Sequence, residues 1–324
     1  MKGLMRAVLA AVFGVAVGAT AAMAQSYPNR PIRMFVGFPP GGGADIVARV
    51  VGNALSIRLG QPIVIENKGG TGGNFAAAEV ARSAPDGYTL MHGPDNLFLA
   101  NPHIYGSKMP LDPLTDLVPV SSLAANQLIL AVHPSVKANT MQQFVDLVRK
   151  SNPPLFYASI GNGSMHHMAM EILKQHLKFD LTHVPYRGGG PAGAALLAGD
   201  IQAMFGGGSL VPTITSGKVR ALATTGAKRS PVLPDLPTIG EIYPGYEVLI
   251  WHGTFAPKGT PQPILDRLRK EITAVLQQPD VSERLINSGS GEPYFTTPEE
   301  FAARIRSDNE KFGTVIRALG IKIE

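Results

Sequence analysis

The stretch that decides the fold is 32–59, which reads IRMFVGFPPGGGADIVARVVGNALSIRL. It opens with a short apolar run (32–37), passes through the turn FPPGGGAD (38–45) and continues with apolar residues at helical spacing (44–59). A short apolar run, a glycine-rich turn and a helical pattern together form the strand–loop–helix unit of α/β proteins. The stretch therefore predicts a β-strand that leads directly into an α-helix.

The same unit recurs along the chain, which predicts an α/β fold with parallel sheets. The further runs that we expect to be strands are PIVIEN (62–67), YTLMHG (88–93), LFYAS (155–159), LTHVPY (181–186), IQAMF (201–205) and VRALATT (219–225). The alternation of strand and helix patterns begins again after SSLAANQLILAVHP (121–134), so we expect two α/β units. A proline-dense loop (230–245) then leads to the strand YEVLIWHGTFAP (246–257) and to helices at 261–277 and 298–319.

The N-terminus has the three regions of a secretory signal peptide. MKGLMR is a short basic start, 7–19 is an alanine-rich apolar run, and Ala22-Met23-Ala24 has the A-x-A form of a cleavage site. A membrane anchor is the alternative, but the run is shorter than the ~20 residues that a span needs. We therefore expect residues 1–24 to be removed and the mature protein to reside in the periplasm.

Composition narrows the class of protein further. The chain is 44% hydrophobic and 16% charged, as globular proteins are, and it has no cysteine for a disulfide or a lipid anchor. Its net charge is only +5, and the basic residues are scattered, so together with the compartment this excludes nucleic acid as a partner. We find no P-loop, G-x-S-x-G or H-E-x-x-H pattern, and we expect no cofactor and no metal.

Glycine-rich loops follow most of the predicted strands. Since ligands of α/β sheets bind where the carboxyl ends of strands meet their loops, these loops are the candidate site. They are FPPGGGAD (38–45), NKGGTGGN (67–74), HGPDNLF (92–98), SIGNGSMHH (159–167), PYRGGGPAG (185–193) and FGGGSL (205–210). Several run into a helix N-terminus, where unpaired N–H groups and the helix dipole favour an anion. One such loop alone is equally well explained as a tight turn, but the set predicts an anion site between the two units.

The sequence allows two interpretations for each of three charged or titratable residues. Arg187 either grips a carboxylate through its guanidinium or points to solvent, and the sequence leaves both open. We interpret Asp45 chiefly as a residue that fixes its loop and the helix start, with contact to a ligand amine or water as the alternative. His167 lies four residues before Glu171, but without a third ligand we favour a role at the helix start over a metal site.

In combination, these segments resemble the Bug-type substrate-binding proteins of tripartite tricarboxylate transporters. The resemblance covers essentially the whole mature chain. It is carried by segments such as YPNRPIRMFVGFPPGGGADIVAR (27–49), GQPIVIENKGGTGGN (60–74), SIGNGSMHHMAME (159–171), HVPYRGGGPAGAALLAGDIQAMF (183–205) and WHGTFAPKGTP (251–261).

The resemblance implies a two-lobed periplasmic binding protein of the Venus flytrap type. Lobe I would comprise 25–125 and 246–324, lobe II would comprise 126–245, and two crossover strands near LILAV and EVLIW would form the hinge. It further implies a monomeric receptor, not an enzyme, that closes on a small carboxylate such as an organic acid, an aromatic acid or an amino acid.

Loops of both lobes would hold this ligand. Together with our reading of the residues, the resemblance selects Phe38, Gly41, Gly42, Gly43, Ala44, Asp45, Gly70, Thr71, Gly72, Asn96, Ser159, Gly163, Ser164, His167, Tyr186, Arg187 and Gly188. Because a side chain there would cover the loop backbone, we expect Gly42→Val and Gly43→Val each to abolish binding and to spare the fold.

One segment departs from the family pattern. Where family members often have small hydroxyl residues after the third strand, this chain has GPDNLFLANP (93–102). We expect Asp95, Leu97 and Phe98 to make that wall bulkier and more acidic. The distal half of the pocket would then favour an apolar or amine-bearing group over a second carboxylate.

Three functions of different classes fit these observations. The first is a receptor that delivers a carboxylate to membrane permease subunits, and the second is a periplasmic sensor module that signals to a sensor kinase. The third, an exported hydrolase, lacks a recognisable set of nucleophile, base and orienting group. We therefore expect the receptor.

Overall fold

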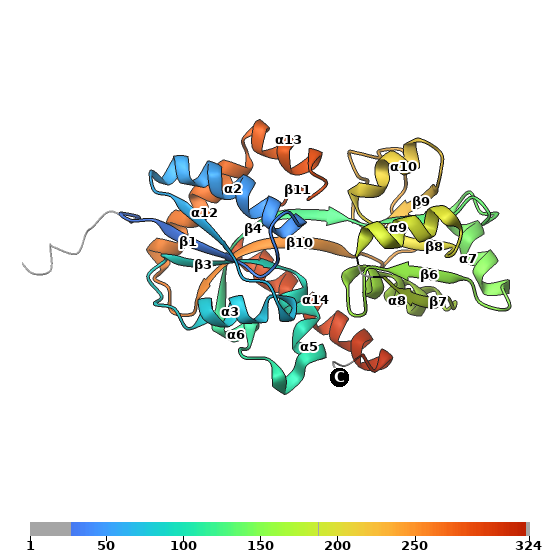
Figure 1. The fold of residues 1–324 in the computed structure, drawn as a ribbon, viewed down its shortest axis with the longest axis horizontal. Coiled ribbons are helices and arrows are strands. Elements are labelled where there is room, and N and C mark those ends of the chain that lie inside the picture. Colours follow the sequence, from blue (N-terminus) through green and yellow to red (C-terminus); the bar gives the residue numbers. More distant parts are fainter. Residues whose placement is uncertain (1–26, 187, 322–324) are drawn as a thin grey trace, which may run out of the picture.

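The structure of the protein is a computed structural model that describes residues 27–186 and 188–321. The predicted signal segment 1–24 and Arg187 lie outside the described residues. Two sheets, each covered by helices, lie side by side along the longest axis of the molecule (Figure 1). We call the elements around the six-stranded sheet the first lobe and those around the five-stranded sheet the second lobe. The predicted two-lobed α/β fold is confirmed.

The six-stranded sheet has the strand order β11-β4-β10-β3-β1-β2. Its strands are β1 (Ile32–Val36), β2 (Ile63–Asn67), β3 (Thr89–Pro94), β4 (Leu117–Gln127), β10 (Leu249–Pro257) and β11 (Glu292–Pro293). β1 is parallel to β2 and β3, whereas β10 is antiparallel to β3 and β4. The predicted parallel arrangement holds for β1, β2 and β3, but the sheet as a whole is mixed, because β10 enters it from the other lobe and runs against its neighbours.

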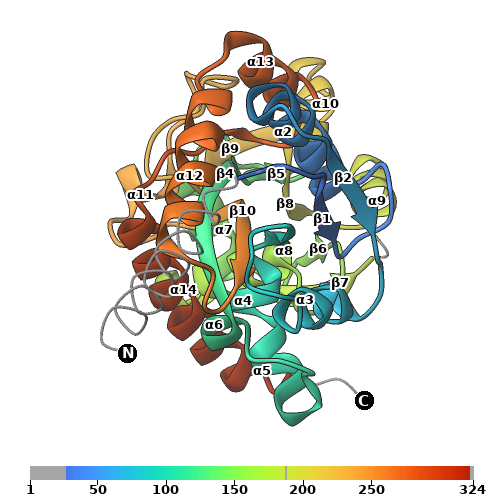
Figure 2. The same cartoon turned by 90° about the vertical axis from the view of Figure 1, so that its left-hand side faces the viewer.

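Helices cover both faces of the first sheet (Figure 2). They are α2 (Gly43–Leu59), α3 (Asn74–Ala81), α4 (Asn96–Leu99), α5 (Asn101–Tyr105), α6 (Pro113–Asp116), α12 (Gln262–Leu276), α13 (Pro279–Asn287) and α14 (Pro298–Leu319). Alternate residues of β1 face opposite sides, so Met34 and Val36 pack in the core with α2 and α12. Phe35 instead packs in the core that contains residues of α3 and α14.

The five-stranded sheet of the second lobe has the order β7-β6-β8-β5-β9. Its strands are β5 (Ile129–Val132), β6 (Phe156–Ser159), β7 (Thr182–Pro185), β8 (Ala203–Gly206) and β9 (Arg220–Thr224). Its helices are α7 (Met141–Lys150), α8 (Met165–Leu177), α9 (Gly189–Ala198), α10 (Val211–Thr215) and α11 (Ile239–Ile242). β6 is parallel to β7 and β8, and β5 is antiparallel to β8 and β9. This sheet is mixed for the same reason, since β5 is the continuation of a first-lobe strand.

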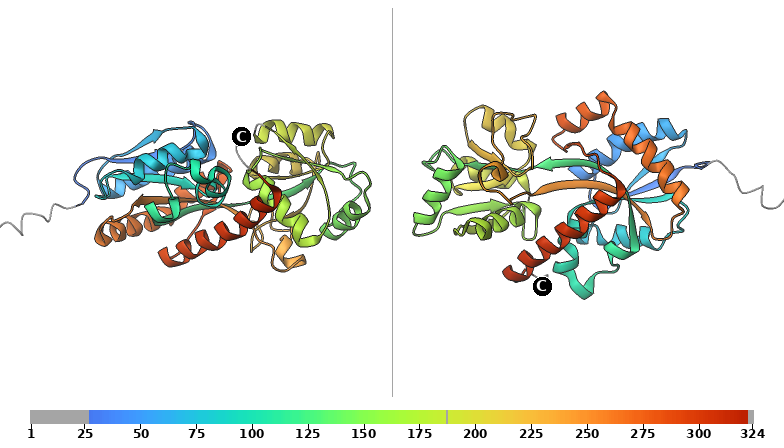
Figure 3. Two further views of the ribbon diagram at one scale, coloured as in Figure 1. Left: turned by 90° about the horizontal axis from the view of Figure 1, so that it is seen from below. Right: turned by 180° about the vertical axis from the view of Figure 1, so that it is seen from behind.

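Two adjacent segments connect the lobes (Figure 3). β4 of the first sheet passes through Leu128 into β5 of the second, and β9 returns through 225–248 to β10. The two connections are hydrogen-bonded to each other, because Thr225 Oγ1 accepts from Leu128 N (2.9 Å) and Leu128 O accepts from Thr225 N (2.9 Å). These are the crossover strands that the resemblance predicts.

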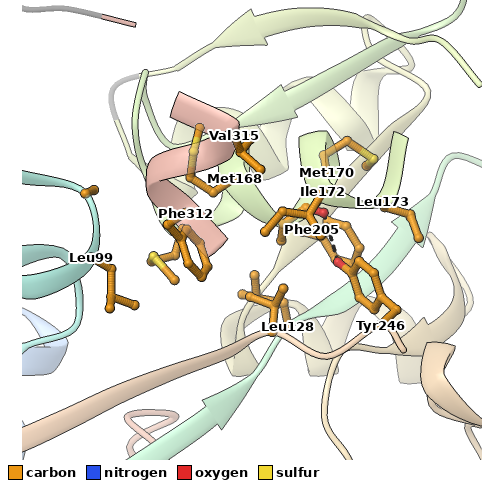
Figure 4. Close-up of a cluster of buried hydrophobic side chains, with 14 of the residues drawn as sticks. Leu99, Leu128, Met168, Met170, Ile172, Leu173, Phe205, Tyr246, Phe312 and Val315 are labelled. Carbon is orange, nitrogen blue, oxygen red and sulfur yellow. Dashed lines mark hydrogen bonds between the residues drawn. The ribbon is translucent and has the colours of Figure 1, made fainter. Parts of the chain in front are cut away.

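A continuous apolar cluster joins the lobes beside these connections (Figure 4). Phe312 and Val315 of α14 belong to the same buried cluster as Met168 and Ile172 of α8. The hydroxyl of Tyr246 also donates to the carbonyl of Ala169 in α8 (2.9 Å). α14, which the sequence assigns to lobe I, therefore packs against both lobes, and the boundaries at 125/126 and 245/246 stay a prediction.

Candidate ligand-binding site

A cavity of about 640 Å³ lies between the lobes, where the carboxyl ends of β1 and β3 face the loop after β6. Both lobes contribute to its wall. The predicted site residues on the wall are Phe38, Gly43, Ala44, Gly72, Asn96, Gly163 and Ser164. Loops far apart in the sequence thus meet at one cavity, as the glycine-rich set predicts.

The other predicted residues do not line this cavity. They are Gly41, Gly42, Asp45, Gly70, Ser159, His167, Tyr186 and Gly188. Arg187 and the side chain of Thr71 lie outside what the structure describes, so their proposed contact with a ligand stays a prediction.

Asp45 fixes the loop that precedes α2. Its buried carboxylate accepts hydrogen bonds from Gly41 N, Arg49 Nε and Asn67 Nδ2, each at 2.9 Å. Burial works to raise the pKa of Asp45, but the hydrogen bonds from Arg49, Gly41 and Asn67 outweigh it and hold the pKa below its usual value. The loop-fixing interpretation agrees with these contacts, because the carboxylate is fully occupied by protein donors.

The first turn of α2 presents bare backbone to the cavity. Its N-cap, Gly42, is extended and offers no side chain, and no side chain caps this helix end. Gly43 and Ala44, the first two helical residues, both line the cavity. Their N–H groups have no partner within the helix, and the helix dipole places partial positive charge at this end. This turn is therefore suited to bind a negatively charged oxygen.

Two asparagines hold the second glycine loop against the cavity. The carbonyl of Gly72 accepts from Asn101 Nδ2 (3.0 Å) and from Asn96 Nδ2 (3.2 Å). Gly72 has a positive φ of 64°, and a Cβ there would lie 2.9 Å from Asn101 Nδ2. Glycine is required at this position, and Asn101, which the sequence did not single out, also lines the cavity.

The expected bulky wall after β3 is wrong, whereas the carboxyl-bearing residue Asp95 does lie on the cavity wall. Leu97 and Phe98 are buried in the core, because α4 turns both side chains away from the cavity. The carboxyl group of Asp95 accepts from Asn96 N (2.6 Å) and Trp251 N (3.3 Å), which ties the loop to β10. Burial raises the pKa of Asp95 to about 7, so this group is far less acidic than an exposed carboxylate.

The loop of the second lobe is held by its own side chains. Ser164 caps α8 and accepts from His167 N (3.3 Å), and His167 Nδ1 accepts from Gly163 N (3.2 Å). The His167 ring stacks on His183, whose Nε2 shares a hydrogen bond with Ser159 Oγ (2.7 Å). These contacts agree with the helix-start interpretation of His167.

A metal at this loop finds no support in the described residues. Glu171 accepts instead from the hydroxyl of Tyr157 (2.5 Å) and from Lys174 Nζ (2.9 Å). No group of three or more histidine, aspartate or glutamate side chains in the described parts of the chain could hold an ion.

Other wall residues were not singled out from the sequence. Ile104, Tyr105 and Ile250 give the cavity a largely apolar part together with Ile160 of the predicted loop 159–167, and His166 and His252 lie on the wall as well. Ile250 and His252 belong to β10, where the apolar run reads as a plain core strand. A signal was present in the alternation of that strand, since every second residue of β10 faces the same side of the sheet.

Comparison with known proteins agrees with this architecture. Residues 47–321 match the family described as the tripartite tricarboxylate transporter family receptor. The chain belongs to this receptor family. Protein BugT of Bordetella pertussis (strain Tohama I) is 33% identical to it over 98% of both chains.

Two solved structures with bound ligands have the same fold. R. palustris Rpa4515, solved with adipate, is 32% identical, covers 92% of this chain and 100% of its own, and superposes with a TM-score of 0.76. MatC (Rpa3494) from Rhodopseudomonas palustris, solved with bound malate, is 34% identical over 90% of this chain and 100% of its own, with a TM-score of 0.71. The chain is thus a solute-binding receptor of the Bug type, a class of periplasmic binding proteins. Within 27–186 and 188–321, no helix has the length and apolar character that crossing a membrane requires.

Proposed function

We propose that this receptor resides in the periplasm, captures a small carboxylate in the cavity between its lobes and delivers it to the membrane permease subunits of a tripartite transporter. It would act as a monomer and catalyse no reaction. The observation that carries the proposal is the uncapped first turn of α2, which opens onto the cavity at Gly43 and Ala44. The adipate and malate in the related receptors support the same ligand class.

The physical reason is the cost of taking a carboxylate out of water. A buried carboxylate must replace strong hydration with hydrogen-bond donors, and glycine backbone supplies N–H groups that no side chain covers. One helix end contributes only about 0.3–1 kcal/mol, or up to ~2 kcal/mol when partly buried, so several donors must converge. Enclosure between two lobes provides that convergence and excludes the water that would weaken each contact.

The apolar part of the cavity wall narrows the chemical class of the ligand. Ile104 and Tyr105 of the first lobe and Ile160 of the second lie on it. We propose that the end of the ligand distant from α2 is apolar. Of the two groups that the sequence suggests for the distal half of the pocket, apolar or amine-bearing, we thus retain the apolar one. Malate or citrate binding far more tightly than an aromatic or long-chain monocarboxylate would contradict this.

A hydrolase has little support from the described residues. The hydrogen-bonded pair of Ser159 and His183 resembles a nucleophile with its base, but Ser159 is fully buried and neither residue lines the cavity. A substrate in the cavity would not reach this hydroxyl. The sensor alternative shares every residue with the receptor and is separated from it by a transport assay.

A thermal-shift screen tests the ligand class directly. Protein stripped of bound ligand is heated with mono-, di- and tricarboxylates and acidic amino acids. A ligand present at 100 times its dissociation constant stabilises the folded state by about 2.7 kcal/mol. The proposal fails if no carboxylate raises the melting temperature. Loss of carboxylate uptake when the receptor gene is deleted, with uptake restored by the wild-type gene, would separate delivery from signalling.

A further inference from the structure

Two histidines lie together beneath the cavity, on the face of the first sheet that α2 covers. β3 and β10 are antiparallel with His92 opposite Thr254 and His252 opposite Pro94, so His92 and His252 are diagonal neighbours. Their side chains meet, since His92 Nε2 lies 3.2 Å from His252 Nδ1 and the two rings stack with centroids 5.1 Å apart. Leu90, two residues before His92, packs in the core with residues of α2, which places the pair on this face.

Only one of the two rings reaches the cavity. His92 has no exposed surface and does not line the cavity, whereas His252 is 7% exposed and lies on the wall with Gly43 and Ala44. His252 Nδ1 is engaged by His92, and among the described residues no protein group forms a hydrogen bond with the second ring nitrogen, Nε2. His252 is therefore the only member of the pair that a bound molecule can contact.

The shared hydrogen bond allows two arrangements of the ring protons. Burial lowers the pKa of both rings, to about 4 for His252, so both are neutral near pH 7. Either His92 Nε2–H donates to His252 Nδ1, which leaves His252 with its proton on Nε2, or His252 Nδ1–H donates and leaves a bare Nε2. In the second case His92 would carry its proton on Nδ1, and this atom is buried without a hydrogen-bond partner. A buried N–H without an acceptor is rare in proteins, which favours the first arrangement.

We infer that His252 donates its Nε2–H to an oxygen of the bound ligand, and that His92 positions this donor by holding the His252 ring in the Nε2–H tautomer. The inference rests on the proposed function, because an anion at the first turn of α2 repels a bare ring nitrogen and attracts an N–H. It extends the backbone site by one side-chain donor on β10. The chemical class that it selects is a ligand with an acceptor oxygen at this end, and an ammonium group there is disfavoured.

The first test measures affinity by calorimetry for malate, adipate, benzoate and glutamate. His252→Leu removes the donor and should weaken the tightest of these ligands by about ten- to hundredfold, the range for a hydrogen bond to a charged group. His252→Gln keeps an N–H near the position of Nε2 and should stay within a few-fold of the wild type. His92→Leu should weaken binding less, and His92→Gln, which can still donate to the His252 ring, should restore it.

The second test reads the tautomer and does not depend on how the variants fold. Ring-nitrogen NMR of the wild-type protein with the tightest of these four ligands should show His252 protonated at Nε2 and bare at Nδ1. Unchanged affinity in His252→Leu, or a complex with the proton on Nδ1, would overturn the inference and leave the proposed function standing. If the wild type binds none of the panel or of the wider thermal-shift screen, the proposed function itself fails and this inference with it.

Discussion

The described part of the chain contains two stacked pairs of histidines, one in each lobe, and they differ in what completes their hydrogen bonds. In the second lobe the His167 and His183 rings stack at 3.8 Å, and Gly163 N and Ser159 Oγ engage their nitrogens. In the first lobe the His92 and His252 rings bond to each other, and the protein supplies no further partner to His92 Nδ1.

The difference separates a structural histidine from one available to a ligand. In the second-lobe pair one nitrogen of each ring is engaged by a neighbouring loop group, and neither ring lines the cavity, so a molecule bound there does not contact them. A ring on the cavity wall with one nitrogen unused gains a hydrogen bond when a ligand arrives, because a buried polar group without a partner is costly. The pair in the first lobe therefore belongs to the site, and the pair in the second lobe holds the loop that encloses it.

The largest expected effect comes from the helix end beside His252. Gly43→Val should abolish carboxylate binding, because a branched side chain crowds the bare N–H groups of α2. Gly43 has no positive φ, and a Cβ there would meet only Ser290 Oγ at 4.0 Å, so the fold should be retained. Calorimetry with the best carboxylate of the screen measures the loss.

Gly42→Val is the matched control, and here the structure revises the expectation drawn from the sequence. Gly42 does not line the cavity, and a Cβ there would approach nothing closer than Pro39 O at 3.8 Å. We now expect this variant to bind nearly as the wild type does. Equal loss of affinity in both variants would show that the loop acts as a whole and not through the first turn of α2.

The next effect should fall on stability and not on affinity. His167→Leu leaves Gly163 N without its acceptor and should lower the free energy of unfolding by about 1–3 kcal/mol. Urea denaturation measures this change. His252→Leu is the counterpart and should lose affinity, and it should also lower stability by a similar amount, because it leaves the buried His92 Nε2 without its partner. If His167→Leu weakens binding as much as His252→Leu does while remaining folded, the contrast between the pairs is wrong.

The buried histidines also make stability depend on pH. Burial lowers the pKa of His252 from 6.5 to about 4, so between these values only the unfolded chain binds the proton. Stability should therefore fall as the pH is lowered from 6.5 towards 4, by at most about 1.4 kcal/mol per pH unit for this one group. Denaturation at several pH values should give a shallower slope for His252→Gln than for the wild type. Parallel slopes would show that His252 is already charged in the folded protein.

The smallest effect concerns the approach of the lobes. A Cβ at Gly208 of the second lobe would lie 3.3 Å from Gly289 Cα of the first, whereas a Cβ at Gly207 would meet nothing within 4 Å. Gly208→Ala should weaken carboxylate binding about threefold, or ~0.7 kcal/mol, by holding the lobes slightly apart. Gly207→Ala is the control and should bind normally. Equal carboxylate affinities of the two variants would show that the contact between Gly208 and Gly289 does not affect binding.

The sequence predicted structure best in segments whose local amino-acid composition or pattern is distinctive. The turn FPPGGGAD predicted an exposed backbone at the start of α2, and the helix at 298–319 was predicted with the bounds that α14 has. Ser164 precedes a helical pattern, and it caps α8 in the structure.

Tertiary contacts decide the features that the sequence could not predict. Leu97 and Phe98 follow a strand as pocket residues do, but the single turn of α4 rotates them into the core. His252 lies in an apolar strand, and its role depends on His92, which is 160 positions away in the chain. The antiparallel direction of β10 likewise follows from its return between the lobes and not from any local pattern.

The most direct test of the account is a crystal structure of the protein with the carboxylate that stabilises it most. We predict that the carboxylate lies at the first turn of α2, with one ligand oxygen about 2.7–3.2 Å from His252 Nε2 and none near the rings of His167 and His183. A ligand bound elsewhere, or one at the α2 turn that leaves His252 Nε2 without a contact, would contradict the account.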